Sequence, residues 1–77
     1  MDGVEISIVI PVYNSAEMLP TLHDRLYAVL TGTGKSFEIL YIDDGSQDGS
    51  WTALRQLQAN FPGHVVAIQL MRNFASA

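Results

Sequence analysis

The chain has 77 residues, and its four Lys and Arg against eight Asp and Glu give a net charge of −4. A chain of this length makes one domain at most and buries only about 60% of its unfolded surface, so we expect it to be part of something larger. The sequence has no basic cluster, which argues against nucleic acid as a partner. The absence of cysteine excludes a disulfide scaffold and fits a reducing compartment.

Membrane insertion is not expected from this sequence. The apolar runs are only a few residues long, whereas a membrane span needs roughly 20, and the acidic start at residues 2–5 does not fit a signal peptide. We therefore expect a cytoplasmic protein, or one that other residues hold at the cytoplasmic face of a membrane.

The first predicted element is a buried parallel strand at Ile6–Ile10. The strand is rich in β-branched side chains and apolar on both faces, which is typical of a strand covered by helices on both sides. A helix is predicted next, over Pro20–Leu30, ending before Gly32. Its predicted apolar face consists of Leu19, Leu22, Leu26 and Val29. His23 lies off that face, so we expect it on the helix surface, too far from His64 to share a metal ion.

The second half of the chain repeats this pattern. Strands are predicted at Phe37–Ile42 and Val65–Met71. Between them, Asp48 is expected to cap a helix by accepting hydrogen bonds from first-turn N–H groups. The apolar stripe of this helix consists of Trp51, Leu54, Leu57 and Phe61. The order strand, helix, strand, helix, strand predicts right-handed crossovers and a three-stranded parallel sheet, which is an α/β, Rossmann-like half-domain.

Polar residues follow each predicted strand, at residues 12–14, 43–46 and 72–73. A parallel sheet gathers the carboxyl ends of its strands at one edge, where such folds bind ligands. The first turn, residues 11–17, contains neither glycine nor the Gly-Lys-Ser/Thr of a P-loop, which excludes the usual dinucleotide and triphosphate sites. It offers the ring of Tyr13, the amide of Asn14 and the carboxylate of Glu17, which suit a base or ribose.

The adjacent carboxylates of Asp43 and Asp44 follow the second strand. Neighbouring side chains at a strand end point to opposite sides, so one can face the crevice while the other braces the loop. A carboxylate can accept hydrogen bonds from a base N–H or from ribose hydroxyls, and Gly45 allows close backbone approach. The alternative is a simple turn with a helix cap, because Asp, Gly and Ser are common turn residues.

Three motifs together carry a resemblance to a known family. Residues 8–14 read Ile-Val-Ile-Pro-Val-Tyr-Asn, residues 42–46 read Ile-Asp-Asp-Gly-Ser with Asp-Gly-Ser at 48–50, and residues 72–74 read Arg-Asn-Phe. In this order and spacing they resemble the opening of an inverting family 2 glycosyltransferase with the GT-A fold. The last motif is similar to the branch of dolichyl- and polyprenyl-phosphate sugar transferases. The resemblance implies that residues 1–77 are the N-terminal nucleotide-binding half of a GT-A domain.

The resemblance also implies a nucleotide-sugar site. Its residues are Pro11, Tyr13, Asn14, Glu17, Asp43, Asp44 and Arg72. Pro11, Tyr13 and Glu17 would line the nucleoside pocket, and Asp43 would contact the base or ribose with support from Asp44. The residues alone leave alternatives: Glu17 also suits the positive end of a helix dipole, Tyr13 also suits packing, and Arg72 either neutralises a phosphate or pairs with an acidic loop residue.

In the full-length parent, the resemblance implies Mg²⁺ or Mn²⁺ held by an Asp-x-Asp motif, which this sequence lacks. The chain would therefore contain no catalytic residue and no metal site, and it would be inactive alone. The parent enzyme would transfer a sugar from a UDP- or GDP-sugar to an acceptor such as a polyprenyl phosphate. The alternative is a non-catalytic nucleotide-binding or interaction module. Unpaired strand edges and incompletely covered sheet faces predict self-association.

Overall fold

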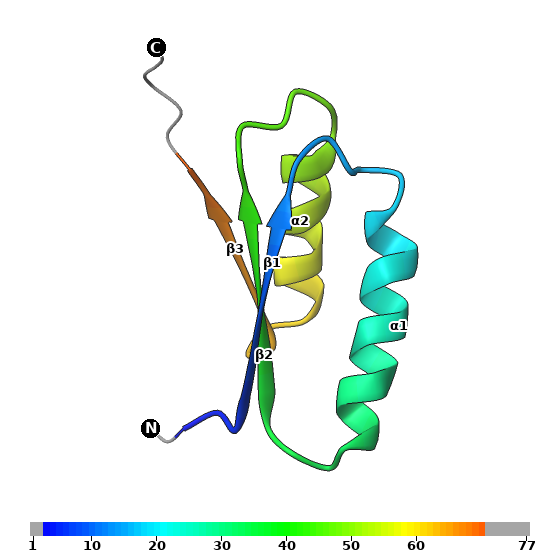
Figure 1. Ribbon diagram of the computed structural model, residues 1–77, viewed down its shortest axis with the longest axis vertical. Coiled ribbons are helices and arrows are strands. Elements are labelled where there is room, and N and C mark those ends of the chain that lie inside the picture. Colours follow the sequence, from blue (N-terminus) through cyan, green and yellow to red (C-terminus); the bar gives the residue numbers. More distant parts are fainter. Residues whose placement is uncertain (1–2, 71–77) are drawn as a thin grey trace.

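The computed structural model describes residues 3–70, which form a three-stranded parallel sheet and two helices. The elements are β1 (Ile6–Val12), α1 (Leu19–Gly32), β2 (Phe37–Asp43), α2 (Ser50–Asn60) and β3 (Val65–Gln69). Strand β2 lies between β1 and β3, and all three strands run in the same direction (Figure 1). The predicted α/β half-domain with its parallel sheet is confirmed. Met71, predicted to end the third strand, lies outside the described residues.

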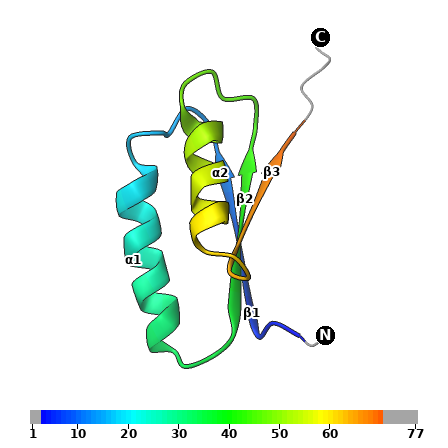
Figure 2. The same ribbon diagram turned by 180° about the vertical axis from the view of Figure 1, so that it is seen from behind.

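Both helices pack on the same face of the sheet, as the two opposite views show (Figures 1 and 2). The strand order runs β1-β2-β3 without reversal, so two crossovers of the same hand place both helices on one side. For the described residues, the prediction that helices cover the first strand on both sides is therefore wrong. Burial alternates along β1, and Val9 is 59% exposed.

The side of the sheet opposite the helices is mostly apolar, and we call it the open face. Strand register and alternation assign to it Val9, Pro11, Leu40, Ile42, Val66 and Ile68. At its amino end, the Ser7 hydroxyl donates a hydrogen bond to Glu38 Oε2 at 2.6 Å. The open face thus has a polar amino end and, beyond it, two apolar rows across the three strands. One row is Val9, Leu40 and Val66, and the other is Pro11, Ile42 and Ile68.

Helix α1 extends beyond its predicted end. Gly32 lies inside the helix, and Thr33 follows it with its N–H donating to the carbonyl of Leu30 at 3.1 Å. Gly34 then adopts a positive φ of 73°, a conformation that glycine takes without steric strain. The chain therefore leaves the helix at the second glycine of this segment and not at the first.

The buried side of α1 is rotated relative to its prediction. Its buried residues are Leu19, His23 and Leu30. Val29, assigned to the apolar face, is 66% exposed. The surface position predicted for His23 is therefore wrong.

His23 lies in an aromatic cage between the sheet and the helices. Its Nδ1 is 2.7 Å from the hydroxyl of Tyr41, and the rings of Tyr27 and Phe61 pack against the imidazole. Burial lowers the pKa of His23, against a smaller opposite effect from the charge of Asp24, while burial raises the pKa of Tyr41 to about 12. The Nδ1 of the imidazole is hydrogen-bonded, whereas its Nε2 is buried without a hydrogen-bond partner within residues 3–70, so the neutral form of the ring is favoured.

Helix α2 follows its predicted apolar stripe. Leu54 is fully buried, while Trp51, Leu57 and Phe61 are half-buried against the core. The buried apolar core lies between the helices and the sheet and consists of Val12, Leu19, Leu30, Phe37, Ile39, Tyr41, Leu54 and Val65. This core fixes the positions from which the two strand-to-helix loops start.

Candidate functional site

The carboxyl ends of the three strands meet at one edge of the sheet. Val12, Asp43 and Gln69 are register partners there. Asp44 N–H donates to the carbonyl of Val12 at 2.9 Å, and Leu70 N–H donates to the carbonyl of Asp43 at 3.0 Å. The loops that follow β1 and β2 both leave from this end of the sheet (Figure 1). The predicted convergence of the first two polar clusters is confirmed.

Asn14 joins the β1–α1 loop to the β2–α2 loop from both sides. Its N–H donates to Ser46 Oγ at 2.8 Å, and its Oδ1 accepts from Gln47 N–H at 2.8 Å. Asn14 has a φ of 47°, in the left-handed region that Asn tolerates better than most residues. Gly45 has a φ of 78°. These two backbone conformations turn the loops toward each other.

Two further hydrogen bonds cross between the loops. Ser15 N–H donates to Ser50 Oγ at 2.8 Å, and Ala16 N–H donates to Asp48 Oδ2 at 3.2 Å. The other carboxylate oxygen of Asp48 accepts from Ser50 N–H at 2.8 Å. The prediction that Asp48 is the cap of this helix is wrong, because the N-cap residue is Gly49, but the expected contact of its carboxylate with a first-turn N–H, that of Ser50, is present. Its link to Ala16 was not predicted.

Hydrogen bonding stabilises the ionised form of Asp48. The Ser50 side chain contributes most to lowering the pKa of this carboxyl, and burial acts in the opposite direction. The N–H groups of Ser50 and Ala16 lower the pKa further. At neutral pH, Asp48 therefore places a negative charge between the two loops.

Asp43 and Asp44 have opposite environments, as their adjacency predicted. Asp43 is fully buried on the helix-covered side, whereas Asp44 is exposed. Within residues 3–70, neither carboxylate oxygen of Asp43 has a hydrogen-bond partner. Burying an ionised carboxylate that accepts no hydrogen bond costs about several kcal/mol, which is the order of its desolvation penalty. Asp43 thus holds two buried carboxylate oxygens, without donors in residues 3–70, at the end of the central strand.

The other predicted site residues are distributed around this edge. Tyr13 is 57% exposed and Pro11 lies on the open face. Glu17 is exposed and lines a hollow at the start of α1. Arg72 lies outside the described residues.

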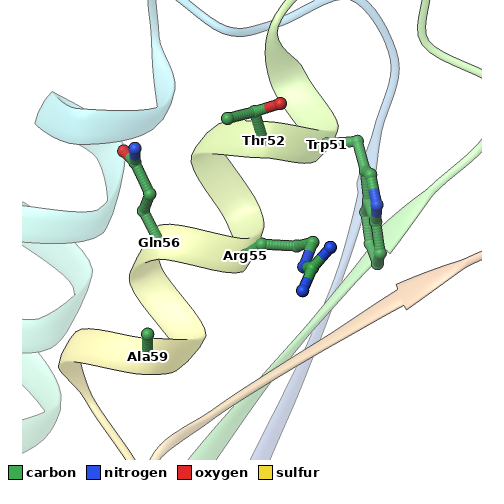
Figure 3. Close-up of a pocket in the computed structure, with 5 residues that line it drawn as sticks. All are labelled: Trp51, Thr52, Arg55, Gln56 and Ala59. Atoms are coloured by element: carbon green, nitrogen blue, oxygen red, sulfur yellow. The ribbon is translucent and has the colours of Figure 1, made fainter.

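A second hollow lies along α2 and is lined by Trp51, Thr52, Arg55, Gln56 and Ala59 (Figure 3). Trp51 and Arg55 project from one side of the helix and Gln56 from the other. These residues belong to none of the motifs at the strand ends. The described part of the chain therefore has its polar network at the sheet edge and a separate shallow depression on a helix.

Within residues 3–70, no three His, Asp or Glu side chains come close enough together to hold a metal ion. In the same part of the chain, no helix has the length and apolar character needed to cross a bilayer.

Comparison with known proteins gives consistent similarities. The family model for glycosyl transferase family 2 matches residues 7–77. An undecaprenyl-phosphate 4-deoxy-4-formamido-L-arabinose transferase of Pectobacterium carotovorum subsp. carotovorum (strain PC1) is 42% identical over 73 residues, which are 95% of this chain and 22% of that protein. A transferase of the same name from Salmonella dublin is 43% identical over 70 residues, 91% of this chain and 21% of its own length. The chain spans about a fifth of the length of these relatives.

Proposed function

Since the chain belongs to glycosyl transferase family 2, as its motifs predicted, we propose that it is the nucleotide-binding half of a sugar-transferring enzyme. The longer parent takes a sugar from a UDP- or GDP-sugar and passes it to a polyprenyl phosphate, with inversion at the anomeric carbon. The acceptor class is supported by the relatives, whose names specify undecaprenyl phosphate.

The observation that carries this proposal is the buried carboxylate of Asp43 at the end of the central strand. Its oxygens have no hydrogen-bond partner within the described residues, so they can accept from a base N–H or from ribose hydroxyls. Asp44 is exposed beside it, and the ring of Tyr13 is available for stacking on a base. These groups favour the nucleoside part of the donor as the ligand of this edge.

Access to Asp43 requires a local movement. The side chain is fully buried, so a ligand reaches its carboxylate only after neighbouring groups shift. Asp44 is accessible without such a change. We therefore propose that Asp44 and Tyr13 contact the nucleoside first. Asp43 then accepts a hydrogen bond from the nucleoside once the groups that cover its carboxylate have moved.

The chemical step belongs to other parts of the parent. The residues described do not provide a metal site, and the sequence has no Asp-x-Asp motif. When bound elsewhere in the parent, Mg²⁺ or Mn²⁺ would stabilise the negative charge of the leaving diphosphate. This chain contributes binding and orientation of the nucleoside, and we place the parent at the cytoplasmic face of a membrane, where its lipid acceptor lies.

A transfer assay with radiolabelled UDP- and GDP-sugars tests the proposal. The longer parent should label undecaprenyl phosphate in the presence of Mn²⁺, and the 77-residue chain should not. Nucleotide binding by a parent that transfers no sugar to any lipid phosphate would favour the alternative, a non-catalytic nucleotide-binding module. Metal-dependent transfer by the 77-residue chain alone would contradict the assignment of catalysis to other residues.

A further inference from the structure

The turn after β1 presents three successive backbone N–H groups, from residues 14, 15 and 16, to the neighbouring loop. Each donates to a side-chain oxygen, and the acceptors are Ser46, Ser50 and Asp48. Successive N–H groups of this kind form an anion-binding concavity in many proteins. In dinucleotide-binding Rossmann folds, the first strand-to-helix turn is where the pyrophosphate binds. Here the corresponding donors are already occupied by the chain itself.

We propose that the carboxylate of Asp48 acts as an internal anion for this turn: it accepts from Ala16 N–H, fixes the turn for nucleoside contact and denies this N–H group to the diphosphate. The inference rests on the proposed nucleotide-binding function. Asp48 is then a positioning residue, because it acts through residues 13–16 and does not itself touch the nucleotide.

The geometry supports this role for Asp48 in particular. Its two oxygens accept from Ala16 N–H and Ser50 N–H, so one carboxylate joins the β1–α1 turn to the start of α2. Ser50 is fully buried, which fixes the position of that anchor. The two loops also approach each other at Gly49, where a Cβ would lie in ordinary van der Waals contact with the Cβ of Ala16, at 3.9 Å.

A consequence follows for ligand preference. With the turn closed by Asp48, the diphosphate gains nothing from these donors, so a nucleoside and its diphosphate should bind with similar affinity in the absence of a divalent metal. When Asp48 is removed, Ala16 loses its link to the neighbouring loop and its N–H becomes available to phosphate, while the N–H groups of Asn14 and Ser15 keep their serine acceptors. Nucleoside binding should therefore weaken while the relative preference for the diphosphate rises.

Hydrogen–deuterium exchange resolved to single amides tests the contact between Asp48 and the β1–α1 turn without any ligand. In Asp48→Ala, exchange at the amide of Ala16 should be faster by about tenfold, while the amide of Ile39 in the sheet is unchanged. Asp48→Asn retains one acceptor oxygen and should give a smaller increase. Asp24→Ala removes the same charge from the exposed surface of α1 and serves as the control. Unchanged exchange at Ala16 in Asp48→Ala would overturn the proposal.

Calorimetric titration of uridine, UDP, guanosine and GDP without divalent metal tests the effect on binding. Asp48→Ala should bind the preferred nucleoside about tenfold more weakly, and its ratio of diphosphate to nucleoside affinity should rise severalfold above that of the unsubstituted chain. A purely structural role would weaken both ligands equally, and an unchanged ratio would overturn the proposal. If neither the unsubstituted chain nor Asp48→Ala binds any of the four ligands, the proposed function fails. Faster exchange in Asp48→Ala would still show that Asp48 holds the β1–α1 turn.

Discussion

The two faces of the sheet are built from the same three strands but have opposite environments. On the helix-covered face, Ile39, Tyr41 and Asp43 are fully buried. On the open face, Val66 is 41% exposed and Ile68 is 37% exposed, although both are as apolar as the residues of the core. The difference shows that the apolar composition of a strand does not determine which of its faces is covered, because in residues 3–70 the crossover topology places both helices on one face.

The largest expected effect comes from substitutions on the covered side. Leu54→Ala should reduce the free energy of unfolding by about 2–5 kcal/mol, enough to unfold a domain of this size. Val66→Ala on the open face should change it by less than about 1 kcal/mol, because little contact is lost. Urea denaturation followed by circular dichroism measures both values. Similar losses for the two variants would contradict the assignment of the faces.

The covered face should also make stability depend on pH through His23. Burial lowers its pKa in the folded state below the ordinary value of 6.5, so the unfolded chain takes up a proton first as the pH falls. The contribution of His23 to the free energy of unfolding is complete above pH 6.5 and declines below it, by at most about 1.4 kcal/mol per pH unit for one proton. His23→Phe should flatten this slope between pH 6.5 and about 5, above the range in which carboxylates titrate. An unchanged slope in the variant would show that another group is responsible.

The open face should govern association more than folding. Among residues 3–70, β1 and β3 each pair only with β2, so we expect the 77-residue chain to self-associate through its open face and edges. The double substitution Val9→Lys and Val66→Lys should shift the chain toward the monomer in light scattering, with a stability change of about 0.5 kcal/mol or less per site.

A matched control places the same charges on the outer surface of α1. Met18, the N-cap of α1, and Val29 within α1 are as exposed as Val9, and neither belongs to the sheet. Met18→Lys with Val29→Lys should leave the association state unchanged. A monodisperse monomer of the unsubstituted chain at high concentration would contradict the self-association.

Much of the fold follows from local patterns. The order of the five elements, the parallel sheet and the start of the second strand at Phe37 were predicted correctly, because alternating and helical periods are local properties of the sequence. The buried position of His23 could not be predicted in this way. Its partner, the hydroxyl of Tyr41, is 18 residues away in the sequence, and only the folded chain brings the two together.

The site was predicted in part. The placement of Asp43 and Asp44 at a strand end and the cap-like contact of Asp48 follow from turn chemistry. The contact of Asp48 with Ala16, 32 residues earlier, depends on how closely the two crossover loops approach. The full burial of Ser50 has the same origin. Roles in nucleotide binding stay predictions for all of these residues.

Calorimetric titration of UDP and GDP into the chain tests the central claim most directly. The unsubstituted chain should bind one of the two nucleotides, and Asp24→Asn, which changes an exposed acidic residue of α1, should bind it equally well. Asp43→Asn should weaken the binding free energy by about 1–3 kcal/mol, because a charged acceptor at the end of the central strand is lost. Equal affinities for Asp43→Asn and the unsubstituted chain would contradict the assignment of this sheet edge as the nucleotide site.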